Sequence, residues 1–93
     1  MFEKGKMYTL VIEWDTCEDP DPDDIGQETC GAYEFGEAVA PEELAGAILG
    51  AKEEARDLLD SMGRGWVNLL IGEGNCVDDV TVETATKVYT FEA

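Results

Sequence analysis

The sequence predicts an α+β fold in two layers: a mainly antiparallel sheet with one amphipathic helix packed on one face, in the order strand-strand-helix-strand-strand. Three observations predict it. Residues 8–14 and 32–39 place most of their large hydrophobic side chains at every second position, so that these share one face as in half-buried strands, and residues 66–71 are nearly all apolar. Residues 44–62 instead repeat their hydrophobic side chains at steps of three and four, as amphipathic helices do. A chain of 93 residues is expected to form one compact domain, 1–93.

The two alternating segments are expected to direct every second side chain into the core. Those side chains are Tyr8, Leu10, Ile12 and Trp14 in the first segment, and Tyr33, Phe35 and Val39 in the second. Gly36 is expected to mark a bulge or a close backbone contact within the second strand. The apolar run 66–71 has no polar face, which favours a central strand.

The helix is bounded by residues that favour helix ends. Pro41 suits the first helical position, and the carboxylates of Glu42 and Glu43 complement the helix dipole there. Gly63 follows the last periodic residue and is expected to end the helix. Beyond it, residues 72–75 are expected to form a turn.

Residues 77–91 alternate again, and two arrangements remain open for them. They form either one long strand with a bulge or a hairpin broken near 84–86. In both arrangements the expected core contacts are Val80, Val82, Val88 and Phe91.

Charge excludes several classes of function. With 22 acidic residues, 6 basic residues and no histidine, the chain has a formal net charge of −16. No basic stripe for binding phosphates, no histidine-based catalysis and no histidine-ligated metal site are therefore expected. At 44% hydrophobic residues the chain is expected to fold. Spread over a domain of roughly 30 Å, the net charge would approach the charge density of duplex DNA.

No long apolar run predicts a membrane span, and the first residues do not resemble a signal peptide, so cytoplasmic residence is expected. Either Met1 or Met7 is a candidate for the natural start. Cys17, Cys30 and Cys76 lack the spacing of zinc or redox sites. If the strands flanking the acidic loop 15–31 pair, Cys17 and Cys30 lie opposite each other, and both a disulfide and two reduced thiols remain open.

The acidic side chains also lack the pattern of a metal site or of an active site. The loop lacks the glycine and glutamate positions of a calcium-binding EF-hand. A small two-layer domain leaves little room for a deep cleft with two differently tuned carboxylates. We therefore expect no enzyme activity, no catalytic residues, no metal and no cofactor.

The acids are instead grouped as a surface for a partner. On a helical wheel Glu53, Asp57 and Asp60 lie opposite the core, at steps that make them neighbours. Few basic residues are available to pair with them, and Leu49 lies on a flanking side. The candidate partner-binding residues are Asp15, Glu18, Asp19, Asp21, Asp23, Asp24, Glu28, Glu42, Leu49, Glu53, Asp57, Asp60, Asp78 and Asp79.

In size, net charge, α+β architecture and rows of carboxylates, the chain resembles the small acidic proteins with which phages and mobile elements disable host defences. These are the anti-CRISPR proteins and related DNA mimics. The resemblance implies a non-enzymatic inhibitor that occupies a basic DNA- or RNA-binding surface of a host complex, such as a CRISPR effector, in the host cytoplasm. It implies no direct contact with nucleic acid or membrane, and it leaves a homodimer open.

Two other functions compete with this interpretation. A domain adapted to high salt would use its acids for solubility, and a small regulatory subunit would bind a basic protein without imitating DNA.

Overall fold

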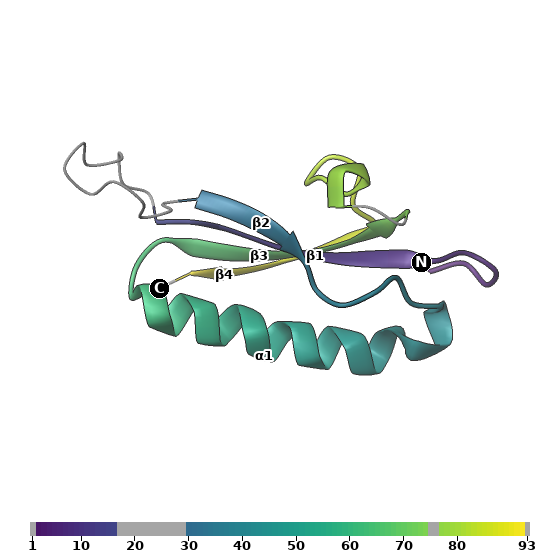
Figure 1. The fold of residues 1–93 in the computed structure, drawn as a ribbon, viewed down its shortest axis with the longest axis horizontal. Coiled ribbons are helices and arrows are strands. Elements are labelled where there is room, and N and C mark those ends of the chain that lie inside the picture. The colour runs from purple at the N-terminus through teal and green to yellow at the C-terminus, as the bar shows by residue number, and fades with distance from the viewer. Residues whose placement is uncertain (1, 17–29, 75–76, 93) are drawn as a thin grey trace.

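A computed structural model describes residues 2–16, 30–74 and 77–92 of the chain. It contains one four-stranded antiparallel sheet with a helix packed against one face, which confirms the predicted two-layer α+β fold (Figure 1). The sheet order is β2-β1-β3-β4. The elements are β1 (Tyr8–Asp15), β2 (Cys30–Glu34), the 3-10 helix η1 (Pro41–Glu43), α1 (Leu44–Met62), β3 (Trp66–Glu73), the 3-10 helix η2 (Val77–Asp79) and β4 (Lys87–Glu92).

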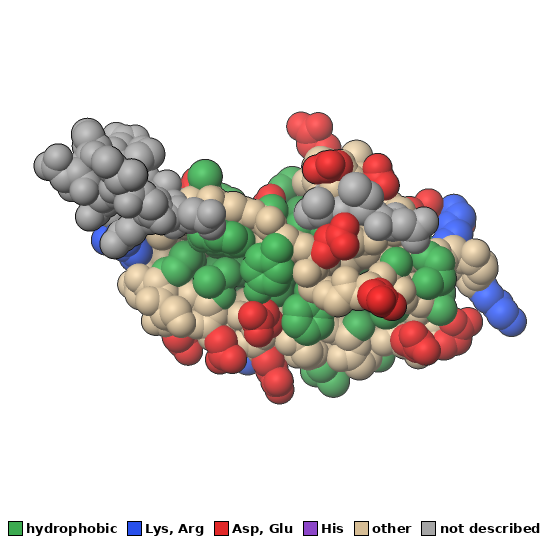
Figure 2. Space-filling model, viewed as in Figure 1, with side chains coloured by type: hydrophobic (Ala, Val, Ile, Leu, Met, Phe, Trp, Pro, Cys, Tyr) green, Lys and Arg blue, Asp and Glu red, His purple; other side chains and the backbone are tan. Residues whose placement is uncertain are grey.

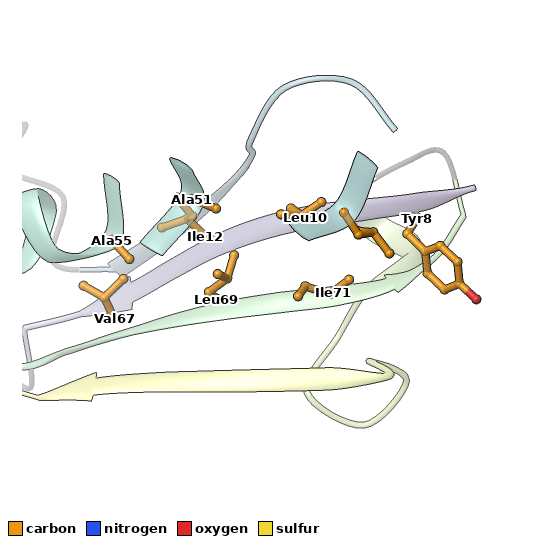
Figure 3. Packing of buried hydrophobic residues seen from close by; sticks show 9 residues of the cluster. Tyr8, Leu10, Ile12, Ala51, Ala55, Val67, Leu69 and Ile71 are labelled. Atoms are coloured by element: carbon orange, nitrogen blue, oxygen red, sulfur yellow. The ribbon is translucent and has the colours of Figure 1, made fainter. Parts of the chain in front are cut away.

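The main core lies between the sheet and α1. Ile12 in β1 pairs with Leu69 in β3 and with Tyr33 in β2, so these side chains share the helix face of the sheet. Figure 3 shows side chains of both central strands directed toward the small residues of α1. The buried cluster is Tyr8, Leu10, Ile12, Leu44, Ala51, Ala55, Val67, Leu69 and Ile71. Each large aliphatic side chain buried in this way stabilises the fold by roughly 1.5–3 kcal/mol.

The expected helix ends are confirmed. Pro41 opens a single 3-10 turn, which continues directly into α1 at Leu44. Gly63 adopts the left-handed conformation, with φ of 71°, and its N–H donates a hydrogen bond of 2.8 Å to the carbonyl oxygen of Leu59. Glycine reaches this conformation without a Cβ penalty, so the helix ends there. None of the described helices is long and apolar enough to cross a membrane.

The second strand differs from its predicted bounds. β2 runs from Cys30 to Glu34, not from 32 to 39, and Gly36 lies beyond it in a bend with φ of 72°. After the bend Val39 returns to the sheet and exchanges two backbone hydrogen bonds of 2.9 Å with Tyr8. Asp15 and Cys30 are paired within the ladder, so both belong to strands and not to the acidic loop. Cys17 lies outside the described residues, and with it the question of a disulfide to Cys30.

The segment 77–91 follows neither of the two expected arrangements: η2 and a turn precede β4. Within the turn the Thr81 N–H donates a hydrogen bond of 2.8 Å to Thr84 Oγ1, and the Thr84 N–H donates one of 3.2 Å to Thr81 Oγ1. Such local bonds compete with a strand ladder. Val80 is buried against Val11 on the sheet face opposite α1. Val82 is 55% exposed, so its predicted core contact is wrong.

Candidate partner-binding surface

The outer side of α1 carries a row of carboxylates. Glu53, Asp57 and Asp60 are exposed, as predicted, and none of the three is in an ion pair with a described residue. Their steps of four and three along the helix place neighbouring Cβ atoms ~5–6 Å apart. Glu42 is exposed in the turn that precedes the helix. We call Glu53, Asp57 and Asp60 the helix acid row.

The two basic residues of α1 are directed away from the helix acid row. Lys52 Nζ lies 4.2 Å from the centroid of the Tyr89 ring, and the guanidinium carbon of Arg56 lies 5.6 Å from that of Phe91. Both rings belong to β4. Cation–π attraction therefore holds these charges over the sheet edge. This arrangement explains why the acid row lacks partners on its own helix.

The opposite flank of α1 faces β2 and is aromatic. The Tyr33 hydroxyl donates a hydrogen bond of 3.2 Å to Glu54 Oε1. Burial of the ring, together with the negative charge of Glu54, raises the pKa of Tyr33 to about 12. The Trp14 ring lies 5.9 Å from that of Tyr33 and covers Gly31, where a Cβ would be 2.5 Å from the indole. Figure 2 shows this side of the molecule with acids along the helix and hydrophobic side chains above them.

Leu49 is an exposed hydrophobic side chain beside the helix acid row. Its side chain is 66% exposed, the highest value among the large hydrophobic residues that the structure describes. Glu53 follows one turn later, and nothing lies within 4 Å of the position that a Cβ on Gly46 would occupy. The exposed leucine and the carboxylates therefore lie side by side on one helix surface.

The remaining described candidates lie elsewhere. Asp78 and Asp79 are exposed on η2, on the opposite side of the sheet from α1 (Figure 1). Asp15 is half-buried at the end of β1, where its register partners are Cys30 and Trp66. The structure therefore does not bring these acids together with the helix acid row. The loop candidates Glu18, Asp19, Asp21, Asp23, Asp24 and Glu28 lie outside the described residues.

Sequence reasoning missed a polar row across the sheet face opposite α1. Asn68 Nδ2 donates a hydrogen bond of 3.0 Å to Glu13 Oε1, and Thr90 Oγ1 donates one of 2.8 Å to Asn68 Oδ1. The alternation of residues 8–14 places Glu13 on that face, but only the pairing register brings Asn68 and Thr90 beside it. The bonds join three strands and hold the Glu13 carboxylate in place.

The charge that the structure places is smaller than the net charge of the whole chain. The described residues carry 16 acidic and 6 basic side chains, a net charge of −10, and the other six acids lie between residues 17 and 29. The expected approach to the charge density of duplex DNA therefore stays a prediction. Among the described residues no group of histidine, cysteine or acidic side chains could hold a metal ion.

Comparison with known proteins found no matching family model, no similar curated protein and no matching solved structure.

Proposed function

We propose that the chain is a non-enzymatic inhibitor of a host nucleic-acid-targeting complex, of the anti-CRISPR or DNA-mimic kind. It acts in the host cytoplasm and occupies a basic DNA- or RNA-binding surface with the acids of α1. A CRISPR effector is one complex with such a surface. The chain itself contacts neither nucleic acid nor membrane.

The observation that carries the proposal is that the helix acid row forms no ion pair with a described residue. Like charges at these helical steps cost stability, and a surface that serves only solubility normally mixes both signs. Here the available cations, Lys52 and Arg56, lie over aromatic rings of β4 instead of neutralising the row. Within the part of the chain that the structure describes, no cation neutralises Glu53, Asp57 and Asp60, so their carboxylates can meet a partner's cations.

A groove lined with lysine and arginine binds nucleic acid largely by neutralising phosphates and releasing counterions. A rigid helix that presents carboxylates at regular spacing competes for the same cations, and charge attraction speeds the encounter. Charge alone does not select one basic protein among many. The exposed Leu49, one turn before Glu53, offers a hydrophobic contact next to the row.

The proposal is tested by reversing the row. The triple variant E53K/D57K/D60K and the wild-type chain are each immobilised and exposed to host lysate at low salt. We expect the wild type to retain a nucleic-acid-binding protein and the triple variant to lose it. Because like-charge contacts across an interface cost several kcal/mol, the expected loss of affinity is about 100-fold or more.

The double variant D78K/D79K is the matched control, because it reverses exposed acids on the other side of the sheet. We expect it to retain the same protein. Equal retention by wild type and triple variant would remove the helix from the proposal.

Two alternative functions are favoured by one observation: exposed acids lie on both sides of the sheet, on α1 and on η2. That distribution suits an acidic domain adapted to high salt, or a regulatory domain that binds a basic protein without imitating DNA. A chain adapted to high salt would need molar salt to fold. A cooperative melting transition in 50 mM salt would exclude that adaptation.

A further inference from the structure

Among the described strands β4 lies at one edge of the sheet and pairs with β3 alone. An edge strand presents backbone N–H and C=O groups that another extended segment can bind. At β4 these groups lie next to a local concentration of positive charge, in a chain that is otherwise strongly acidic. The edge is independent of the helix acid row.

The outward groups of β4 follow from the pairing. The Ile71 carbonyl oxygen accepts a hydrogen bond of 2.8 Å from the Thr86 N–H, so the peptide groups of Ile71 point toward β4. Peptide groups of successive strand residues alternate in direction, and the register pairs Ile71 with Lys87. Lys87, and then every second residue, therefore bonds β3. The residues whose N–H and C=O groups point outward are Val88, Thr90 and Glu92.

Three of the chain's six basic residues lie along this edge. Lys52 and Lys87 both approach the Tyr89 ring, with Nζ at 4.2 Å and 5.3 Å from its centroid. Arg56 lies over Phe91, the next residue of β4 on the same face. The rings hold the three cations on the helix side of the strand, beside the positions that side chains of an added strand would occupy.

We propose that the β4 edge is a docking site for an extended acidic segment of a partner protein. The segment adds a fifth strand through the outward groups of Val88, Thr90 and Glu92. Its alternate carboxylates, on the helix side, then face Lys52, Arg56 and Lys87. Cross-strand pairs of opposite charge favour such pairing.

A second copy of this chain is a poorer occupant. Two β4 edges that pair antiparallel across a two-fold axis, with their helices on the same side, bring both sets of cations to one junction. Like charges opposite each other destabilise a strand pair. The net charge of −16 on each copy adds long-range repulsion.

The test uses the full-length chain and two capped hexapeptides, one alternating glutamate with valine and one alternating lysine with valine. Binding is followed by amide chemical shifts and amide hydrogen exchange. We expect the acidic peptide to bind at least ~10-fold more tightly, as a few favourable cross-strand charge pairs would produce. Shift changes should concentrate in β4, and exchange should slow at Val88, Thr90 and Glu92.

The test is demanding because the net charge alone predicts the opposite preference. Tighter binding of the lysine peptide, equal binding of the two peptides, or shift changes centred outside β4 would overturn the proposal. If the acidic peptide did not bind at millimolar concentration, the proposal would also be overturned. The cations would then serve only to prevent strand pairing at this edge.

Three variants separate the contribution of the backbone from that of the charges. Thr90→Pro removes an outward N–H without removing a bond to β3, and proline is tolerated on edge strands. We expect it to abolish acidic-peptide binding, and Thr90→Val, which loses the same hydroxyl but keeps the N–H, is the matched reference that should still bind the peptide. The double variant K52Q/R56Q should lose the preference for the acidic peptide. A melting curve confirms that each variant is folded.

Discussion

The two flanks of α1 carry opposite charges that meet different surroundings. On the outer side, Glu53, Asp57 and Asp60 are exposed and pair with no described residue. On the flank toward β4, Lys52 and Arg56 lie over aromatic rings. This difference shows that the position of a charged residue around a helix does not by itself determine which group its side chain contacts. The neighbouring strand decides it, because aromatic rings at the sheet edge compete with acids for the same cations.

The largest expected effect is a difference between the two flanks in their contribution to partner binding. Neutralising the row with E53Q/D57N/D60N should weaken binding to the captured partner by about 10–100-fold, because each exposed charge contact contributes up to ~1 kcal/mol. Neutralising the other flank with K52Q/R56Q should change the affinity by no more than about twofold. Titration calorimetry at 50 mM salt measures both. Equal losses in the two variants would mean that the flanks do not act separately.

The next effect is on the stability of the fold, which should depend on the flank toward β4 and not on the outer flank. Loss of two cation–π contacts in K52Q/R56Q should lower the free energy of unfolding by about 1–2 kcal/mol. E53Q/D57N/D60N relieves like-charge neighbours and should raise it by about 0.5 kcal/mol. Urea denaturation followed by tryptophan fluorescence measures both values. A destabilised acid variant would show that the row has unrecognised partners within the fold.

Much of this arrangement was predictable from the sequence, because periodicity and end signals are local. The fold class, the limits of α1, the central position of β3 and the exposure of the helix acid row all follow from spacing. The end of β2 was not predictable, because Gly36 bends the chain while Val39 still returns to the sheet.

The features that could not be predicted depend on local hydrogen bonds in turns or on contacts between segments that are distant in the sequence. The alternation of Val80 and Val82 suggested a strand, but the mutual hydrogen bonds of Thr81 and Thr84 form a turn instead. The position of Lys52 over Tyr89 depends on where β4 lies relative to α1, which no spacing encodes. The same holds for the polar row that joins Glu13 to its neighbours on β3 and β4.

A smaller effect is expected from salt, which should raise the melting temperature more in the wild type than in the variant without the helix acid row. A chain with a net charge of −16 repels itself, so raising NaCl from 50 mM to 500 mM should raise the melting temperature by a few degrees. The gain should be smaller in E53Q/D57N/D60N, because its outer flank no longer contributes to the repulsion. Equal gains in wild type and variant would assign the repulsion to other acids. Calorimetric melting in both salts provides the measurement.

The smallest effect concerns the third flank, where Tyr33 meets Glu54. The pKa of Tyr33 is raised from its ordinary value of 10.0 to about 12 in the folded chain. Between those pH values the unfolded chain ionises this tyrosine while the folded chain keeps the proton, so stability falls as pH rises from 10 to 12. Tyr33→Phe should remove that part of the decline. A tyrosinate absorbance titration of both folded chains checks it: the difference between the two curves should have its midpoint near pH 12, and a midpoint near pH 10 would contradict the assignment.

We propose that the helix acid row occupies a site on its partner that otherwise binds nucleic acid. The most direct test is competition on the captured partner: a labelled DNA duplex is bound to it, and the chain is added at increasing concentration. We predict that the chain displaces the duplex completely, that its apparent affinity falls steeply as salt increases, and that E53K/D57K/D60K displaces none. A ternary complex, in which the chain and the duplex bind the partner together, would contradict the claim.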